Sequence, residues 1–407
     1  MSTSPSVEAG PSGADAVPDN AERPTIRNQP RILSLDGGGV RGLSSLLILK
    51  DFMEEIGRQA GHDSTPLPCE YFDLIGGTST GGLIAIMLGR LRMSVGECIA
   101  KYLELSKEVF NIDRAIVGVI PTRGDRARFD ATRLETVIKK IIKEKLGDPD
   151  TPMHHIPLSD TQIPCPTFVV ATSGTNADGP AVMFRSYGCK GFNADNCAIW
   201  EAARCTSAAP SFFRPMFVKN PPPGGWFIDG GIRNNNPSDL ALDEARRIWP
   251  TVKRFCVVSI GTGRQKSVDF NTRGLKGPES NDGKLKGWPR FIPRLGWGIV
   301  TNTKELAKIM KDCVDISTSC EPTHERMLRT SKSPDPDLQF PYFRFNVERG
   351  MDSIGLQEWK ASTQMSALTL QYMREGATQE KRNACVRYLL NPPDAECKQP
   401  IFDAADN

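Results

Sequence analysis

The sequence lacks the features of membrane-spanning, secreted and nucleic-acid-binding proteins. None of its apolar stretches reaches the roughly 18 to 20 residues that a membrane-spanning helix needs. Its first residues do not combine a basic segment with an apolar one, as a secretion signal would. The formal net charge is only +3, and no run of lysine and arginine is dense enough to predict nucleic-acid binding. We therefore expect a cytoplasmic globular protein.

The cysteines and histidines are not arranged as disulfides or metal sites would require. The 11 cysteines form no C-x-x-C pair, and several lie in apolar segments, where a thiol serves as a small hydrophobic group. The four histidines are not spaced with cysteines as zinc ligands would be. The sequence also has no D-x-D-x-D loop with the downstream glutamate of a calcium site. We expect a reducing compartment, no metal and no cofactor.

The composition changes sharply after the first 29 residues. Residues 1–29 are rich in serine, proline, glycine, alanine and acidic residues and contain no aromatic residue, which predicts a disordered tail. From Arg31 onward, apolar runs alternate with glycine turns and segments of helical spacing. Strands are expected at 31–35, 71–77, 167–173, 224–231, 255–263 and 342–347. Helices are expected at 43–57, 83–89, 91–110, 135–147, 198–209, 236–249, 298–315 and 357–377. This alternation predicts a layered α/β fold with a mainly parallel sheet.

A G-x-S-x-G motif, formed by Gly77, Ser79 and Gly81, lies between a predicted strand and a predicted helix. A serine at such a junction is held on a tight turn that exposes its hydroxyl, and the glycines remove Cβ atoms that would collide. The positive end of the following helix points at the same place. The motif predicts a nucleophilic serine; the alternative is an ordinary glycine-rich turn in which Ser79 caps the helix.

A nucleophilic serine needs a base, and none of the four histidines follows a strand that would bring it to the sheet edge. Asp229 ends a predicted strand, and Gly230 and Gly231 turn the chain away behind it. An ordinary aspartate has a pKa near 3.9, which is too low, but burial would raise it. The alternative is that Asp229 only hydrogen-bonds its own turn, and this segment alone does not decide between the two.

The segment "DGGGVRG", residues 36–42, fits the G-x-G-x-x-G pattern of dinucleotide-binding loops through Gly37, Gly39 and Gly42. That function requires an acidic residue about 20 positions later at the end of a strand, whereas Asp63 lies in a polar loop. The bare amides of Gly37, Gly38 and Gly39 suit an oxyanion hole, where each donor is typically worth about 2.7–4 kcal/mol. Arg41 would brace this loop by a salt bridge or add positive charge.

These motifs, in this order, resemble the patatin-like phospholipases over roughly residues 31–241. The resemblance rests on "DGGGVRG", the Ser79 motif, "WEAARCTSAAPSFFRP" and Asp229-Gly230-Gly231. It implies a three-layer patatin-like α/β fold, with a catalytic domain at 30–245 and a C-terminal extension, 246–407, that packs on the core. It also implies a Ser79–Asp229 dyad that cleaves acyl esters of glycerophospholipids without a metal or a catalytic histidine.

Two other functions and one membrane segment remain as hypotheses. The chain would alternatively be a serine esterase with a Ser–His–Asp triad that uses His324, or a latent lipid-binding protein activated by an effector. Residues 284–300 mix basic side chains with Trp288, Phe291 and Trp297, which suits peripheral contact with an anionic membrane. The alternative is that these aromatic rings pack on their own domain.

Overall fold

The computed structural model describes residues 29–392 except 111–128, 155–164, 190–196, 211, 221–222, 265–318 and 336–337. The predicted tail, the predicted helix at 298–315 and the aromatic segment at 284–300 therefore lie outside the described residues, apart from residue 29. No helix within the described ranges is long and apolar enough to cross a membrane.

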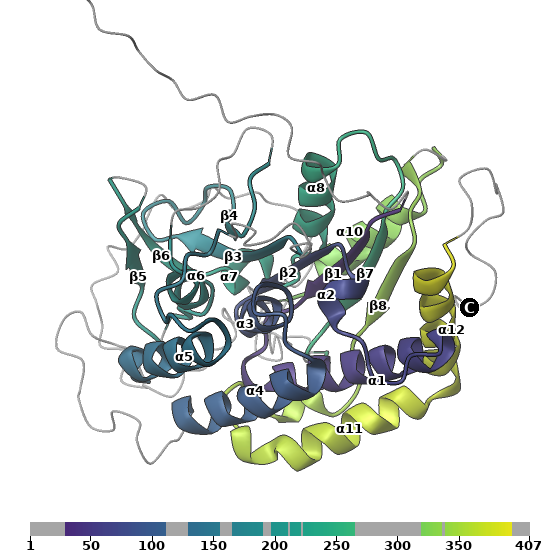
Figure 1. The fold of residues 1–407 in the computed structure, drawn as a ribbon, viewed down its shortest axis with the longest axis horizontal. Coiled ribbons are helices and arrows are strands. Elements are labelled where there is room, and N and C mark those ends of the chain that lie inside the picture. Colours follow the sequence, from purple (N-terminus) through teal and green to yellow (C-terminus); the bar gives the residue numbers. More distant parts are fainter. Residues whose placement is uncertain are drawn as a thin grey trace, which may run out of the picture.

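An eight-stranded sheet forms the centre of the protein (Figure 1). Its strands are β1 (Arg31–Leu35), β2 (Leu74–Thr78), β3 (Thr167–Ser173), β4 (Val182–Arg185), β5 (Met216–Val218), β6 (Gly225–Asp229), β7 (Cys256–Ile260) and β8 (Tyr342–Phe345). The strand order is β5-β6-β3-β2-β1-β7-β8, and β4 also pairs with β3. The pairs that join β3, β2, β1, β7 and β8 are parallel, whereas β4, β5 and β6 are antiparallel to their neighbours. The mainly parallel sheet confirms the predicted fold class.

Helices cover both faces of the sheet (Figure 1). One face carries α8 (Ser238–Ile248) and α10 (Glu321–Ser331). The other face carries α1 (Gly42–Ala60), α3 (Thr80–Ala85), α4 (Val95–Val109), α5 (Ala131–Leu146), α6 (Ile199–Thr206), α11 (Ser362–Arg374) and α12 (Gly376–Leu390). Shorter pieces are α2 (Pro68–Tyr71), α7 (Gly231–Asn234), a π-helical turn (Ile86–Arg90) and three 3₁₀ turns at Gly39–Arg41, Met351–Ser353 and Trp359–Ala361.

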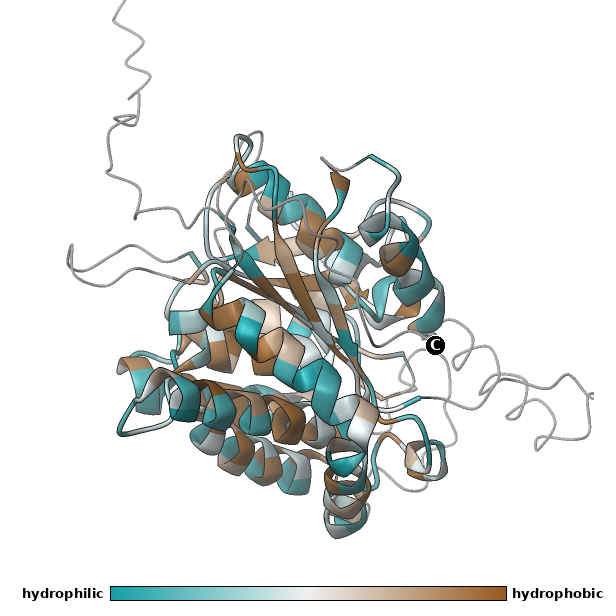
Figure 2. Cartoon of the chain, turned by 90° about the vertical axis from the view of Figure 1, so that its right-hand side faces the viewer, coloured by the Kyte–Doolittle hydropathy of each residue, from teal (hydrophilic) through white to brown (hydrophobic). Residues whose placement is uncertain are grey.

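The central strands are mostly apolar because both of their faces are buried. On β1, Ile32 points into the core under α8, while Leu33 and Leu35 point into the larger core under α1. Figure 2 shows the same arrangement, with largely hydrophobic strands between helices whose outer faces are hydrophilic. The result is a three-layer fold with two separate apolar clusters.

Several helix ends follow the capping signals of the sequence. The α5 helix ends at Gly147, as predicted, and this glycine has a φ of 84° that suits a residue without Cβ. The helix predicted at 91–110 begins later, at Val95, because Ser94 and Glu97 form a capping box. The helix predicted from Asn236 with Pro237 as its first residue begins at Ser238, whose N–H donates to Asn236 Oδ1 at 3.1 Å.

Two predictions about the later elements were incomplete. The helix predicted at 357–377 is shorter, because Glu375 leaves the helical conformation, and α12 then begins as a separate helix. The α10 helix was not predicted. Residues after 245 provide β7, which pairs with β1, and β8 at the sheet edge. The helices α11 and α12, which also follow residue 245, pack against α1. This part of the chain therefore packs on the core, as predicted.

Candidate active site

Ser79 lies on the turn between β2 and α3, in a backbone conformation that is rare for a residue with a side chain. Its φ is 55°. The turn is tight, since a Cβ at Gly81 would collide with the carbonyl oxygens of Leu35 and Asp36. The Ser79 N–H donates to Thr206 Oγ1 at 2.9 Å, which ties the turn to α6. The strained turn is therefore fixed by its surroundings, as in other functional sites.

The Ser79 hydroxyl faces the carboxylate of Asp229. Ser79 Oγ donates to Asp229 Oδ2 at 2.6 Å, although the two residues are 150 positions apart. The serine side chain makes no capping hydrogen bond to α3, so the capping alternative is not what the structure shows. The other oxygen, Asp229 Oδ1, accepts the N–H of Gly231 at 2.7 Å. Asp229 thus contacts both the serine and its own turn, one with each oxygen.

The strand that carries Asp229 is antiparallel to its neighbour in the mainly parallel sheet. In β6, Asp229 lies opposite Ala171 of β3. Asp229 still reaches Ser79, because Thr78 is opposite Val170 in the adjoining pair of strands. The register of β6, and not a shared carboxyl edge, places the carboxylate.

Burial changes the acidity of Asp229. The residue is 4% exposed. Burial raises the pKa of Asp229 to about 7, even though the hydrogen bonds from Ser79 and Gly231 lower it. A base with a pKa near the working pH combines an ionised form with a strong tendency to accept a proton. The site therefore overcomes the low basicity of an ordinary aspartate.

The three amides of the glycine loop differ in availability. The Gly37 N–H donates to the Asn235 carbonyl at 3.0 Å, so it supports the loop and is not free for a ligand. The Gly38 N–H donates to Thr80 Oγ1 at 3.2 Å, a partner that also lines the cavity described below. Gly39 is the first residue of a 3₁₀ turn, and the first N–H groups of a helical segment have no carbonyl partner within that segment. Gly38 and Gly39 line the same cavity, whereas Gly37 does not.

Arg41 and Gly42 hold the end of this loop. The buried Arg41 guanidinium donates to the carbonyls of Gly38 and Met351, each at 3.5 Å. It therefore braces the loop through backbone carbonyls. Gly42 begins α1 at a point where a Cβ would collide with Tyr102, whose hydroxyl donates to the Gly39 carbonyl. These contacts fix both ends of the 3₁₀ turn.

A cavity of about 270 Å³ opens beside the serine and the aspartate. Its walls come from α3, α4, α5, the segment after α6 and the loop that contains Leu356. Its apolar lining includes Leu83, Leu105, Phe110, Leu134, Ala209, Pro210, Phe212, Phe213, Ile232 and Leu356. Such a lining suits a hydrocarbon chain, because few polar groups are present to require water.

The described contacts give His324 no place beside Ser79. It lies on α10, where its Nδ1 is 3.1 Å from the hydroxyl of Tyr342, and it does not line the cavity. Burial lowers the pKa of His324. No group of three or more potential metal ligands occurs among the described residues.

A serine on a strained strand–helix turn, facing a buried carboxylate and an apolar cavity, is typical of serine hydrolases with α/β folds. The chain belongs to the patatin-like phospholipase family, whose sequence model matches residues 33–242. The motif resemblance is thus confirmed.

Several curated proteins are similar to this chain. Human calcium-independent phospholipase A2-gamma is 34% identical over 251 residues, which cover 60% of this chain and 29% of the relative. Patatin-like protein 2 of Arabidopsis thaliana is 30% identical, covering 65% of this chain and 67% of the relative. The rat 85/88 kDa calcium-independent phospholipase A2 is 27% identical over 400 residues, which cover 90% of this chain and 41% of the relative. The chain therefore spans less than a third of the human relative.

We predict that Asp229→Asn changes the pH dependence of stability. The pKa of Asp229 is about 7 in the folded protein, so between about pH 4 and pH 7 the folded wild type binds one more proton than the unfolded chain does. The stability of the wild type therefore falls as the pH rises through that window. Asparagine does not ionise. The free energy of unfolding of the variant, relative to wild type, should therefore increase by roughly 3 kcal/mol between about pH 5 and pH 9. Urea unfolding at both pH values measures this; a pH-independent difference contradicts it.

Proposed function

We propose that this protein is a lipid acyl hydrolase of the phospholipase A type, with Ser79 as nucleophile and Asp229 as base. The observation that carries the proposal is the 2.6 Å hydrogen bond from Ser79 Oγ to Asp229 Oδ2 beside an apolar cavity. The family membership and the names of the relatives support a phospholipid as substrate.

In the proposed reaction, Asp229 Oδ2 takes the hydroxyl proton while Ser79 Oγ attacks the acyl carbonyl. The N–H of Gly231, bound to Oδ1, keeps the carboxylate oriented during this transfer. The protonated Asp229 then gives the proton to the leaving alcohol of the lysolipid, and an acyl-enzyme remains on Ser79. Water that loses its proton to Asp229 hydrolyses this ester and restores the serine.

The negative oxygen of the tetrahedral intermediate would be bound by backbone amides of the loop Gly38–Gly39. Both residues line the cavity, and their lack of side chains lets a carbonyl oxygen approach the backbone. Gly37 supports this loop from behind through Asn235. The hydrogen bond from Gly38 N–H to Thr80 Oγ1 is long, at 3.2 Å, and Thr80 lines the cavity, so we propose that the oxyanion competes for this amide.

The same reasoning gives the chemical class of the substrate. The apolar cavity would take one acyl chain, and the polar head group would stay outside. No step of this mechanism needs a metal ion, since Asp229 supplies the base, and the relatives are named as calcium-independent enzymes.

We further propose peripheral contact with an anionic lipid surface through residues 284–300, which lie outside the described residues. Trp288, Phe291 and Trp297 would enter the interface, and the basic residues between them would bind lipid phosphates.

The proposed dyad predicts the effect of three substitutions on fatty-acid release from phosphatidylcholine vesicles. Ser79→Ala and Asp229→Asn should each lower the rate by at least about 10³-fold. Nucleophile and base act as one unit, so that removing either one costs about as much as removing both. His324→Ala should keep the rate within a few-fold of wild type, and a calcium chelator should have no effect. Loss of activity in His324→Ala with retention in Asp229→Asn would instead favour a histidine triad.

The cavity predicts a change in chain-length preference. Leu134 is buried in its wall, and Leu134→Phe should narrow it. In such a pocket, space for one methylene of the substrate changes the free energy of transition-state binding by about 1–3 kcal/mol. Because the short ester does not need this space, kcat/KM for a 16-carbon ester should fall roughly 10- to 100-fold relative to that for a 2-carbon ester. Leu134→Met, which conserves volume, is the matched control. Equal losses on both esters would show that the chain lies elsewhere.

The membrane segment predicts weaker binding to anionic vesicles after Trp288→Ala and Trp297→Ala. Sedimentation with vesicles that contain phosphatidylserine should show a lower bound fraction, since each indole contributes apolar area to the interface. Hydrolysis of a water-soluble ester should be unchanged and serves as the control for folding. Unchanged vesicle partitioning would eliminate this segment as the contact.

A further inference from the structure

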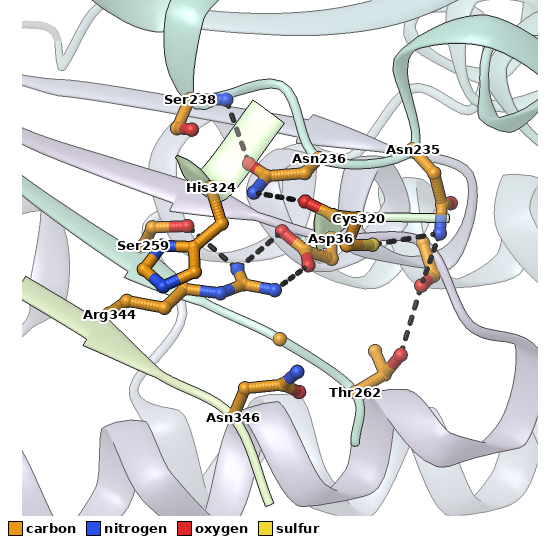
Figure 3. A network of polar contacts seen from close by, with 12 residues as sticks. Asp36, Asn235, Asn236, Ser238, Ser259, Thr262, Cys320, His324, Arg344 and Asn346 are labelled. Carbon is orange, nitrogen blue, oxygen red and sulfur yellow. Dashed lines mark hydrogen bonds and ion pairs between the residues drawn. The ribbon is translucent and has the colours of Figure 1, made fainter. Parts of the chain in front are cut away.

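A buried arginine from the late part of the chain contacts the start of the glycine loop. Arg344 lies on β8, about 100 residues beyond the part matched by the family model. Its Nη1 donates to Asp36 Oδ1 at 2.9 Å and to Ser259 Oγ at 2.8 Å, and its Nη2 pairs with Asp36 Oδ2. Figure 3 shows this pair at the centre of a polar network between β1, β7 and β8.

Asp36 is the residue at which the chain leaves β1 and enters the glycine loop. Its own N–H donates to the Ile260 carbonyl at 3.1 Å, so backbone and side chain are both fixed. Gly37, the next residue, is fixed as well, because its carbonyl accepts a hydrogen bond from Thr262 Oγ1 at 3.0 Å (Figure 3). The chain just before Gly38 and Gly39 is therefore held by β7 and by the residues that follow it.

The ion pair is well suited to fixing a position. Asp36 is 1% exposed and Arg344 is 8% exposed, so water does not compete for their hydrogen bonds. Burial alone would lower the pKa of Arg344, but the Asp36 carboxylate raises this pKa by a larger amount. The guanidinium therefore stays charged. The planar fork of arginine binds both carboxylate oxygens at once, which fixes orientation as well as distance.

We propose that Arg344 is a positioning residue for the oxyanion loop: by holding the Asp36 carboxylate, it aims the Gly38 and Gly39 amides at the reacting carbonyl. This inference rests on the proposed function. A backbone amide is aimed by the φ and ψ angles of its own chain, so its direction depends on how that chain is held. Displacements of about 1 Å at a reacting centre cost about 10²-fold in rate. Arg344 would thus help to complete the active site without touching the substrate.

Arg344→Gln, Arg344→Lys and Asp36→Asn test the proposal in the full chain with a short water-soluble ester. We expect Arg344→Gln to lower kcat about 10²-fold with little change in KM, because the oxyanion forms only in the transition state. Arg344→Lys, which keeps the charge but loses the fork, should lose less. A trifluoromethyl ketone forms a tetrahedral adduct with a nucleophilic serine, and its inhibition constant should rise in proportion to the loss of kcat/KM.

The matched control is Arg185→Gln. Arg185 on β4 pairs with the buried Glu244 on α8 through two hydrogen bonds of 2.6 and 2.9 Å, so it is a buried ion pair of the same kind away from the loop. Both arginine variants should unfold at lower urea concentration. Only the Arg344 and Asp36 variants should lose kcat and affinity for the ketone per folded molecule.

The outcomes separate this inference from the proposed function. If wild type shows no Ser79-dependent hydrolysis, the proposed function is wrong. If wild type is active but the Arg344 and Asp36 variants match Arg185→Gln in kcat and in ketone inhibition, Arg344 is only structural and the inference is wrong. Should Arg344→Gln fail to fold, Arg344→Lys and Asp36→Asn decide by the same two measurements. The pH dependence of kcat should keep its shape in all of them, since the dyad is intact.

Discussion

The arrangement of this site depends on one buried hydrogen bond, from the hydroxyl of Ser79 to the carboxylate of Asp229. A carboxylate is costly to bury, and that cost is what raises its pKa to about 7. The fold must therefore surround Asp229 with apolar walls and still supply two hydrogen bonds. It does so with the serine on one oxygen and the Gly231 amide on the other. Both partners orient the carboxylate without adding a charge that would make it less basic.

The remaining contacts keep a strained backbone in place. Ser79 has a φ of 55°, a conformation that persists only when neighbouring elements hold it. Thr206 from α6 accepts its N–H, and Thr78 Oγ1 donates to the Asn234 carbonyl at 2.7 Å. Asn235, one residue further, accepts the Gly37 N–H. The turn with the serine, the turn after the aspartate and the glycine loop are thus linked to one another.

The sequence predicted the parts of this site that have local signatures. Glycines beside Ser79 and after Asp229 mark turns in which a Cβ has no room, and such turns are visible as motifs. Arg344 has no such signature, because one arginine in a short strand gives no spacing from which to infer its partner 308 positions away. The antiparallel direction of β6 was also missed, since strand direction depends on pairing and not on composition. The α12 helix was missed because its apolar residues do not form a clear stripe.

In the proposed dyad, a single aspartate would take the place of the histidine–aspartate pair of a triad. In a triad, the histidine already has a pKa near neutrality, and the carboxylate mainly orients it. Here burial must supply the whole pKa change, which lowers the stability of the fold once the carboxyl ionises. The two apolar clusters on either side of the sheet provide the stability that this requires. The elements after residue 245 contribute to this stability, because β7 and β8 extend the sheet beside β1, and α11 and α12 pack against α1.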